Sequence, residues 1–165
     1  MVDRTRRTSR RLGRVHDLLL QTKWTSAPLA AILKDAVAPF DSGATGRFFI
    51  QSSAIEVDAG AALPLAMVLN ELCTNAVKYG ALSNADGRVD ITTTLDDSGN
   101  QFRLNWVESG GPAVRRPTRH GFGTRLIQHS FVGQLGGEAV LTFAPSGVAC
   151  LLDIPVAALK PPRSE

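Results

Sequence analysis

Three polar residues of different chemistry are spaced to share one face of a helix. Glu71, Asn75 and Lys78 lie at i, i+4 and i+7, which aligns a carboxylate, an amide and an ammonium group. The amide oxygen of Asn75 suits Mg²⁺, an ion that takes few protein ligands and keeps water and phosphate oxygens as its others. Lys78 could contact phosphate, and Glu71 could orient or deprotonate a nucleophile. The alternative is a solvated helix face, although asparagine is a poor helix former.

A second group of residues, WVESGGP (106–112), stands at the end of an alternating strand pattern. The Glu108 carboxylate can accept a hydrogen bond from an exocyclic amine. Gly110 and Gly111 would let a flat ring approach the backbone closely. Trp106 either packs in the core, as large aromatic residues of small domains usually do, or braces such a pocket. This group is therefore suited to a planar ring that carries an amine.

A third group, Gly121, Phe122, Gly123 and Thr124, opens a segment with a helical pattern. Glycine before a helix N-terminus exposes N–H donors toward an anion. The loop that precedes it carries four basic side chains and no acid after Glu108: Arg115, Arg116, Arg119 and His120. A basic loop beside a glycine-bordered pocket suits a polyphosphate, and the alternative is a solvated surface loop.

The elements that must position these residues follow from hydrophobic periodicity and turn signals. Ser26 and Pro28 indicate a helix start, and Gly80 indicates a helix end as a C-cap. Helices are predicted over 9–22, 26–38, 63–79 and 122–135, and strands over 47–51, 88–95, 101–107, 137–144 and 147–155. This order predicts an α+β sandwich, with helices packed on one face of a mixed, mostly antiparallel sheet.

Composition limits the class of protein. The 165 residues, 44% apolar and 20% charged, are enough for one globular domain, and no apolar run reaches the roughly 18 residues of a membrane span. Two cysteines form no disulfide framework and fit a reducing cytoplasm. The net charge of +3 comes from an arginine-rich segment at residues 1–14, and the rest of the chain is slightly acidic. A nucleic-acid partner for that segment ranks below a solvated helix end, because no aromatic residues are interleaved with the arginines.

Together the motifs resemble those of a known family. ELCTNAVKYG (71–80) is similar to the N box of histidine kinase ATP-binding domains, WVESGGP (106–112) to the first glycine box of the HWE subfamily, and GFGTRLI (121–127) to the second glycine box. HDLLLQTKW (16–24) resembles the segment that joins the helical hairpin to the catalytic domain. The resemblance covers about residues 10–156. It implies a Bergerat-type two-layer sandwich, preceded by a remnant of that hairpin.

The resemblance also implies roles for single residues. Asn75 would ligate Mg²⁺, Glu71 would be the catalytic or orienting carboxylate, and Glu108 would bind the adenine amine of ATP. Lys78 would face phosphate and Tyr79 the nucleotide. The remaining candidate nucleotide-binding residues come from the two glycine boxes: Trp106, Gly110, Gly111, Gly121, Phe122, Gly123 and Thr124.

Two positions depart from the family pattern. Asn70 stands where the N box of the HWE subfamily has a histidine, so one signature of the subfamily is missing. Val148 stands where many histidine kinases have a threonine near the base. Glu71 and Asn75 are intact, so the expectation of an ATP site is unaffected.

The acceptor of the phosphoryl group is expected outside this chain. His16, the first of three histidines beside His120 and His129, lacks the flanking residues of an acceptor box. The chain is expected to divide into a hairpin remnant and linker (1–24), an ATP-binding catalytic domain (25–156) and a tail (157–165). The implied enzyme is a bacterial, cytoplasmic two-component histidine kinase that is a phosphoprotein. It would pass the γ-phosphoryl to a histidine-bearing hairpin helix and then to a response regulator receiver domain. The alternative is a regulatory, anti-sigma-type nucleotide switch of the same fold.

Overall fold

A five-stranded sheet forms one layer of the molecule. The computed structural model describes residues 26–41, 46–118 and 122–160. The strands of this sheet follow the order β2-β4-β5-β7-β6, and their bounds are Phe48–Gln51, Arg88–Leu95, Gln101–Ser109, Gly147–Pro155 and Glu138–Ala144 in that order. β2 pairs with β4 in parallel, and the other neighbours are antiparallel. The predicted mixed, mostly antiparallel sheet is confirmed.

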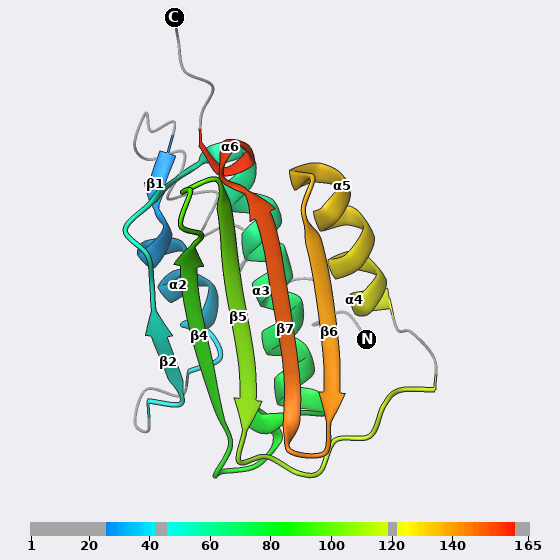
Figure 1. Cartoon of the computed structure of the whole chain (residues 1–165). Helices are drawn as coiled ribbons and strands as arrows, with labels where there is room; N and C mark the ends of the chain where they lie inside the picture. Colours follow the sequence, from blue (N-terminus) through cyan, green and yellow to red (C-terminus); the bar gives the residue numbers. More distant parts are fainter. Residues whose placement is uncertain (1–25, 42–45, 119–121, 161–165) are drawn as a thin grey trace, which may run out of the picture.

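Helices form the second layer and lie on one face of the sheet (Figure 1). Their bounds are Leu29–Val37 for α2, Ala59–Lys78 for α3, Phe122–Arg125 for α4, Val132–Leu135 for α5 and Val156–Leu159 for α6, with a 3₁₀ turn η1 at Ala81–Ser83 and a π-helical segment η2 at Leu126–Phe131. α4, η2 and α5 follow one another without a break, so the helix predicted over 122–135 is confirmed. The α+β class and the helices on one face are confirmed as well.

The start of α2 differs from the prediction. Residues Ser26–Pro28 form a short strand, β1, which pairs with β3 (Glu56–Asp58). The helix therefore begins at Leu29, with Pro28 at the N-cap position. The hydroxyl of Ser26 donates to Glu56 Oε2 instead of capping the helix, which is why its N-cap assignment was wrong.

Both ends of α3 also differ from the sequence-based expectation. Asp58 caps the helix by accepting a hydrogen bond from the Gly60 N–H, so α3 begins at Ala59, before residue 63. At the other end Tyr79 is the C-cap. Gly80 has φ −112°, outside the left-handed region, so its predicted role as a conformational cap was wrong.

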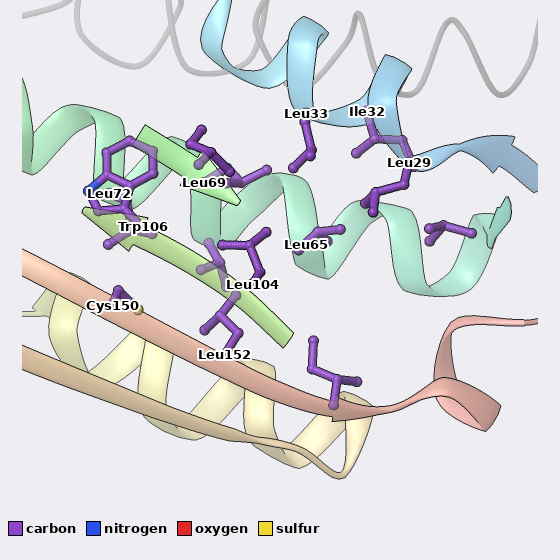
Figure 2. Packing of buried hydrophobic residues seen from close by; sticks show 14 of the residues in the cluster. Leu29, Ile32, Leu33, Leu65, Leu69, Leu72, Leu104, Trp106, Cys150 and Leu152 are labelled. Atoms are coloured by element: carbon purple, nitrogen blue, oxygen red, sulfur yellow. The ribbon is translucent and has the colours of Figure 1, made fainter. Parts of the chain in front are cut away.

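The core lies between the sheet and the helical layer, in which α2 lies beside α3 on the same face of the sheet (Figures 1 and 2). Leu65, Leu69 and Leu72 form the buried stripe of α3, and they share one cluster with Leu29 and Leu33 of α2 and with Leu104, Trp106 and Leu152 of the sheet. Each fully buried side chain of this size contributes about 1.5–3 kcal/mol. The buried leucines of α3 follow the 3.6-residue period of a helix that packs one face against a core.

The helix α3 is long and apolar. Among the described helices, α3 alone has a length and mean hydropathy (1.2) compatible with a membrane span. Half of that stretch is buried inside the domain, as in the core helix of a globular fold.

At the C-terminal end, Leu159 of α6 is fully buried, so the folded domain extends beyond residue 156 into the segment expected to be a tail.

Candidate nucleotide site

A cavity of about 540 Å³ lies where the C-terminal end of α3, the end of β5 and the beginning of α4 meet. Five of the predicted site residues line it: Asn75, Tyr79, Glu108, Gly123 and Thr124. They come from three motifs that are separated by up to 49 positions in the sequence. A second, more open hollow of about 690 Å³ lies between α2 and β2, and none of the predicted site residues lines it. The fold therefore brings members of all three motifs to one cavity.

Glu108 is the buried carboxylate of this cavity, with only 4% of the residue exposed. Its Oε2 accepts a hydrogen bond from the Ala81 N–H at 2.9 Å, and its Oε1 accepts one from the indole N–H of Trp106 at 3.1 Å. Burial raises the pKa of the Glu108 carboxyl above its ordinary value, while these two hydrogen bonds act in the opposite direction. A carboxylate has about four acceptor positions, so two remain for a ligand donor such as an amine.

Two glycines allow the chain to pass close to Glu108. A Cβ atom on Gly80 would lie 2.1 Å from Oε2 of Glu108, and one on Gly147 would lie 1.9 Å from the Glu108 carbonyl oxygen. Both distances are far inside van der Waals contact, so neither position tolerates a side chain without movement. The conformation of Glu108 is thus fixed by its hydrogen bonds and by the absence of neighbouring Cβ atoms.

Asn75 and Glu71 lie at the other predicted part of the site, against the first turn of α4. A Cβ atom on Gly123 would be 2.8 Å from Oε2 of Glu71 and 3.7 Å from Nδ2 of Asn75. Both polar residues are half-buried. Asn75 lines the cavity, whereas Glu71 reaches it only through its contact with Gly123. The N box and the second glycine box are therefore neighbours in the fold.

The donor set around Asn75 fits an ion that brings its own ligands. Within the described ranges, no cluster of three or more His, Cys, Asp or Glu side chains could hold a metal. Asn75 lines the cavity, and its amide group carries one neutral oxygen. Mg²⁺ is commonly bound in this way, through one or two protein oxygens with phosphate and water completing the octahedron.

Several predicted site residues lie elsewhere. Trp106 is fully buried and contacts the site through its hydrogen bond to Glu108. Gly110 and Gly111 do not line the cavity: a Cβ atom on Gly110 would lie 2.7 Å from the Asp86 carbonyl oxygen, and one on Gly111 would lie 2.4 Å from the Ala81 Cα. These two glycines instead allow the end of β5 to pack against the segment 81–87. Lys78 is exposed and is absent from the lining.

Some residues of the second glycine box and two of the three histidines lie outside the described part of the chain. Gly121, His120 and His16 lie outside the described residues, and only the backbone of Phe122 is described, as the first residue of α4. His129 is exposed in η2. The expected hairpin remnant at residues 1–24 also lies outside the described part.

The apolar wall of the cavity was not identified from the sequence. Leu141 and Phe143 of β6 line it together with Val148 of β7, the position of the expected threonine. The basic loop adds Arg115 and Val114, and the Val114 N–H donates to the Pro145 carbonyl at 3.2 Å, which ties the loop to the β6–β7 turn. Strand alternation marks Leu141 and Phe143 as inward-facing, but it does not distinguish a core side chain from a cavity wall.

The fold is that of histidine kinase catalytic domains. The histidine kinase domain of the blue-light-activated histidine kinase from Erythrobacter litoralis EL346 superimposes with a TM-score of 0.70 at 21% identity, over 90% of this chain and 79% of that one. Histidine kinase ThkA, in a crystal structure with the response regulator protein TrrA, gives 0.59 at 18% identity, over 92% of this chain and 48% of that one. The predicted fold class is thereby confirmed.

Sequence similarity also points to histidine kinases. The chain is 42% identical over 141 residues to a blue-light-activated histidine kinase of Brucella anthropi, a match that covers 84% of this chain. The chain spans 29% of the length of that relative. No family model matches the chain. The chain is thus homologous to one part of these histidine kinases, and its resemblance to their catalytic domains is confirmed.

Proposed function

We propose that the chain is the ATP-binding catalytic domain of a two-component sensor histidine kinase of the HWE type. The observation that supports this most is that Asn75, from the N box, and Glu108, from the first glycine box, line one cavity of about 540 Å³. An amide suited to Mg²⁺ and a carboxylate suited to an amine in the same cavity match the two chemically different ends of Mg²⁺-ATP.

The arrangement of the wall suggests how ATP would lie. The adenine would occupy the apolar part, between Leu72 of α3 and the strand residues Leu141 and Phe143, with its exocyclic amine donating to Glu108. The phosphates would then extend toward Asn75 and the first turn of α4. Arg115 lines the same cavity and would add positive charge beside them.

In the proposed reaction the γ-phosphoryl of ATP passes to an imidazole nitrogen of a histidine on a separate helical hairpin. Positioning and neutralisation of charge supply most of the rate in phosphoryl transfer. A Mg²⁺ ion held at Asn75 would neutralise charge on the phosphates. Glu71, which lies beside Gly123, would orient the attacking imidazole. A cytoplasmic location and subsequent transfer to a response regulator belong to the same proposal, and the complex of ThkA with TrrA supports the latter.

Replacement of Asn75 tests the metal role. Asn75→Ala should lower the affinity for ATP in the presence of Mg²⁺ by about tenfold or more, because the only proposed protein ligand of the ion is removed. Calorimetric titration with ATP at fixed Mg²⁺ measures this. Asn105→Ala is the control, because Asn105 lies on β5 and does not line the cavity. Undiminished affinity in Asn75→Ala would contradict the metal role.

A transfer assay distinguishes the two candidate functions. The chain is incubated with γ-labelled ATP and a separately purified histidine-bearing hairpin, and acid-labile label on the hairpin supports the kinase. ATP binding without any transfer would favour the nucleotide switch, and a lack of ATP binding would contradict both.

A further inference from the structure

Arg47 binds the backbone of the segment 81–87, which contacts Glu108 through Ala81. This residue precedes β2, and its half-buried side chain donates three hydrogen bonds to backbone carbonyls of the segment 81–87. Nε donates to Gly87 at 2.8 Å, and Nη2 donates to Ala81 at 3.0 Å and to Asn84 at 2.5 Å. The acceptors lie 34–40 positions away in the sequence, so one guanidinium group fixes both ends of the segment.

The segment 81–87 is held from inside as well. The side-chain oxygen of Asn84 accepts hydrogen bonds from the N–H groups of Asp86 at 3.2 Å and Gly87 at 3.0 Å. A Cβ atom on Gly87 would lie 1.6 Å from the Ala81 carbonyl oxygen, so the two ends of the segment touch. The segment therefore forms a closed turn, and three of its carbonyl groups accept hydrogen bonds from Arg47.

Ala81 connects this turn to the cavity. Its carbonyl oxygen accepts from Arg47, and its N–H donates to Oε2 of Glu108. We propose that Arg47 is a positioning residue of the nucleotide site, which sets the place of the Ala81 N–H and thereby the orientation of the Glu108 carboxylate. Arg47 itself does not line the cavity. The proposal rests on the proposed function, since it identifies Glu108 as the group that reads the base.

The chemistry of arginine suits this role. A planar guanidinium carries several N–H donors in fixed directions and stays charged, and hydrogen bonds from a charged donor are stronger than neutral ones. A lysine at the same place has a single ammonium on a flexible stem, so it could not hold all three carbonyls in the same geometry. Arg47→Lys should therefore retain only part of the effect.

Two measurements on the whole chain test the proposal. The first is hydrogen exchange of the Ala81 amide, and the second is the preference for ATP over purine riboside triphosphate, which lacks the 6-amino group. In Arg47→Met we expect Ala81 to exchange about tenfold faster and the preference for ATP to fall about fivefold, since a hydrogen bond to a charged group is being loosened. Arg47→Lys should lie between Arg47→Met and the unsubstituted chain.

Arg103→Met is the matched control. Arg103 lies on β5, and the Nε of its exposed side chain donates to Asp153 of β7 at 2.9 Å. The Arg103→Met substitution should leave both the exchange rate of the Ala81 amide and the preference for ATP unchanged. This control separates the positioning role of Arg47 from a general loss of charge or stability.

The outcomes are distinguishable. An Ala81 amide that exchanges at the original rate in Arg47→Met, or a preference for ATP that is unchanged, would overturn the proposal. If Arg47→Met does not fold, Arg47→Lys decides by the same two readouts. If the unsubstituted chain binds neither nucleotide, the proposed function fails, whereas the exchange measurement still shows whether Arg47 fixes Ala81.

Discussion

At the scale of single residues, the close contacts of Gly80 explain why a side chain is excluded there. Gly80 has an ordinary negative φ, so backbone conformation does not require glycine. The restriction comes from Glu108, whose Oε2 occupies the place of a Cβ atom, and from the Ala76 Cα at 3.0 Å on the same side. Because glycine has no Cβ atom, the end of α3 can pack directly against the buried carboxylate of Glu108 on β5.

Gly80→Ala should destabilise the domain by about 1–3 kcal/mol and weaken ATP binding, because Glu108 or the helix end has to move. Urea denaturation and nucleotide titration measure the two effects. Gly60→Ala, in the first turn of α3, is the control: its Cβ atom would meet only the end of the Asp58 side chain, at 3.0 Å, so stability should be unchanged or slightly higher. Equal effects at the two positions would contradict the role given to Gly80.

At the scale of elements, α3 and α4 meet through Glu71 and Gly123. The first turn of α4 comes so close to Glu71 that a Cβ atom on Gly123 would lie 2.8 Å from its Oε2. The helix that carries the N box thus also contacts the second glycine box, at Gly123. Asn75, one turn further along α3, lies near the same glycine, so a shift of α4 would alter the surroundings of the proposed metal ligand.

The contact between Glu71 and Gly123 can be tested by a double-mutant cycle in stability. Gly123→Ala should cost about 1–3 kcal/mol in the unsubstituted chain, because the new methyl group collides with the carboxylate. In the Glu71→Ala background the same change should be nearly neutral, since the space is vacated. Chemical denaturation of the four proteins gives the coupling energy. Additive effects would show that the two residues are not in contact.

The elements also show which parts of the sequence are readable. The strands at 88–95 and 101–107 were predictable because apolar residues alternate in both of them. In the structure Asp96 Oδ1 accepts a hydrogen bond from the Asn100 N–H in the turn that joins the two strands. β1 and β3 were not predictable, because three residues are too few to show a period. The buried stripe of α3 was readable from its 3.6-residue spacing.

At the candidate site, the polar residues that line the cavity could be predicted from the sequence, whereas the residues that hold them in place could not. Asn75 and Glu108 were identifiable because their chemistry is unusual for their positions. Arg47 carries no such signal, since its acceptors are carbonyl groups, which every residue has. The requirement at Gly80 depends on Glu108, 28 positions away, and is invisible to any local pattern.

At the scale of the whole molecule, the buried Glu108 links folding to pH. Its pKa is raised in the folded state by burial, whereas in the unfolded chain it is expected near the ordinary value of about 4.3. Between these two pKa values the folded state binds more protons than the unfolded state. The free energy of unfolding therefore falls as the pH rises through this window, and the loss is complete above the folded-state pKa.

Glu108→Gln should remove this contribution. The variant is expected to be less stable overall, because an amide nitrogen would face either the Ala81 N–H or the Trp106 indole. However, its deficit relative to the unsubstituted chain should shrink as the pH rises above about 4.3. Urea denaturation between pH 4 and 8 measures the difference, with Glu138→Gln, at an exposed position of β6, as the control for loss of one charge. A deficit that grows with pH would contradict the raised pKa.

The parallel pairing of β2 and β4 has a consequence for the binding site. Two parallel neighbours require the chain to travel back along the sheet between them, and α3 is the main part of that return path. Only the short segment from residue 79 to residue 87 separates the cavity-lining end of α3 from the start of β4. Separation of this strand pair and loss of the cavity are, for that reason, expected to be one cooperative event.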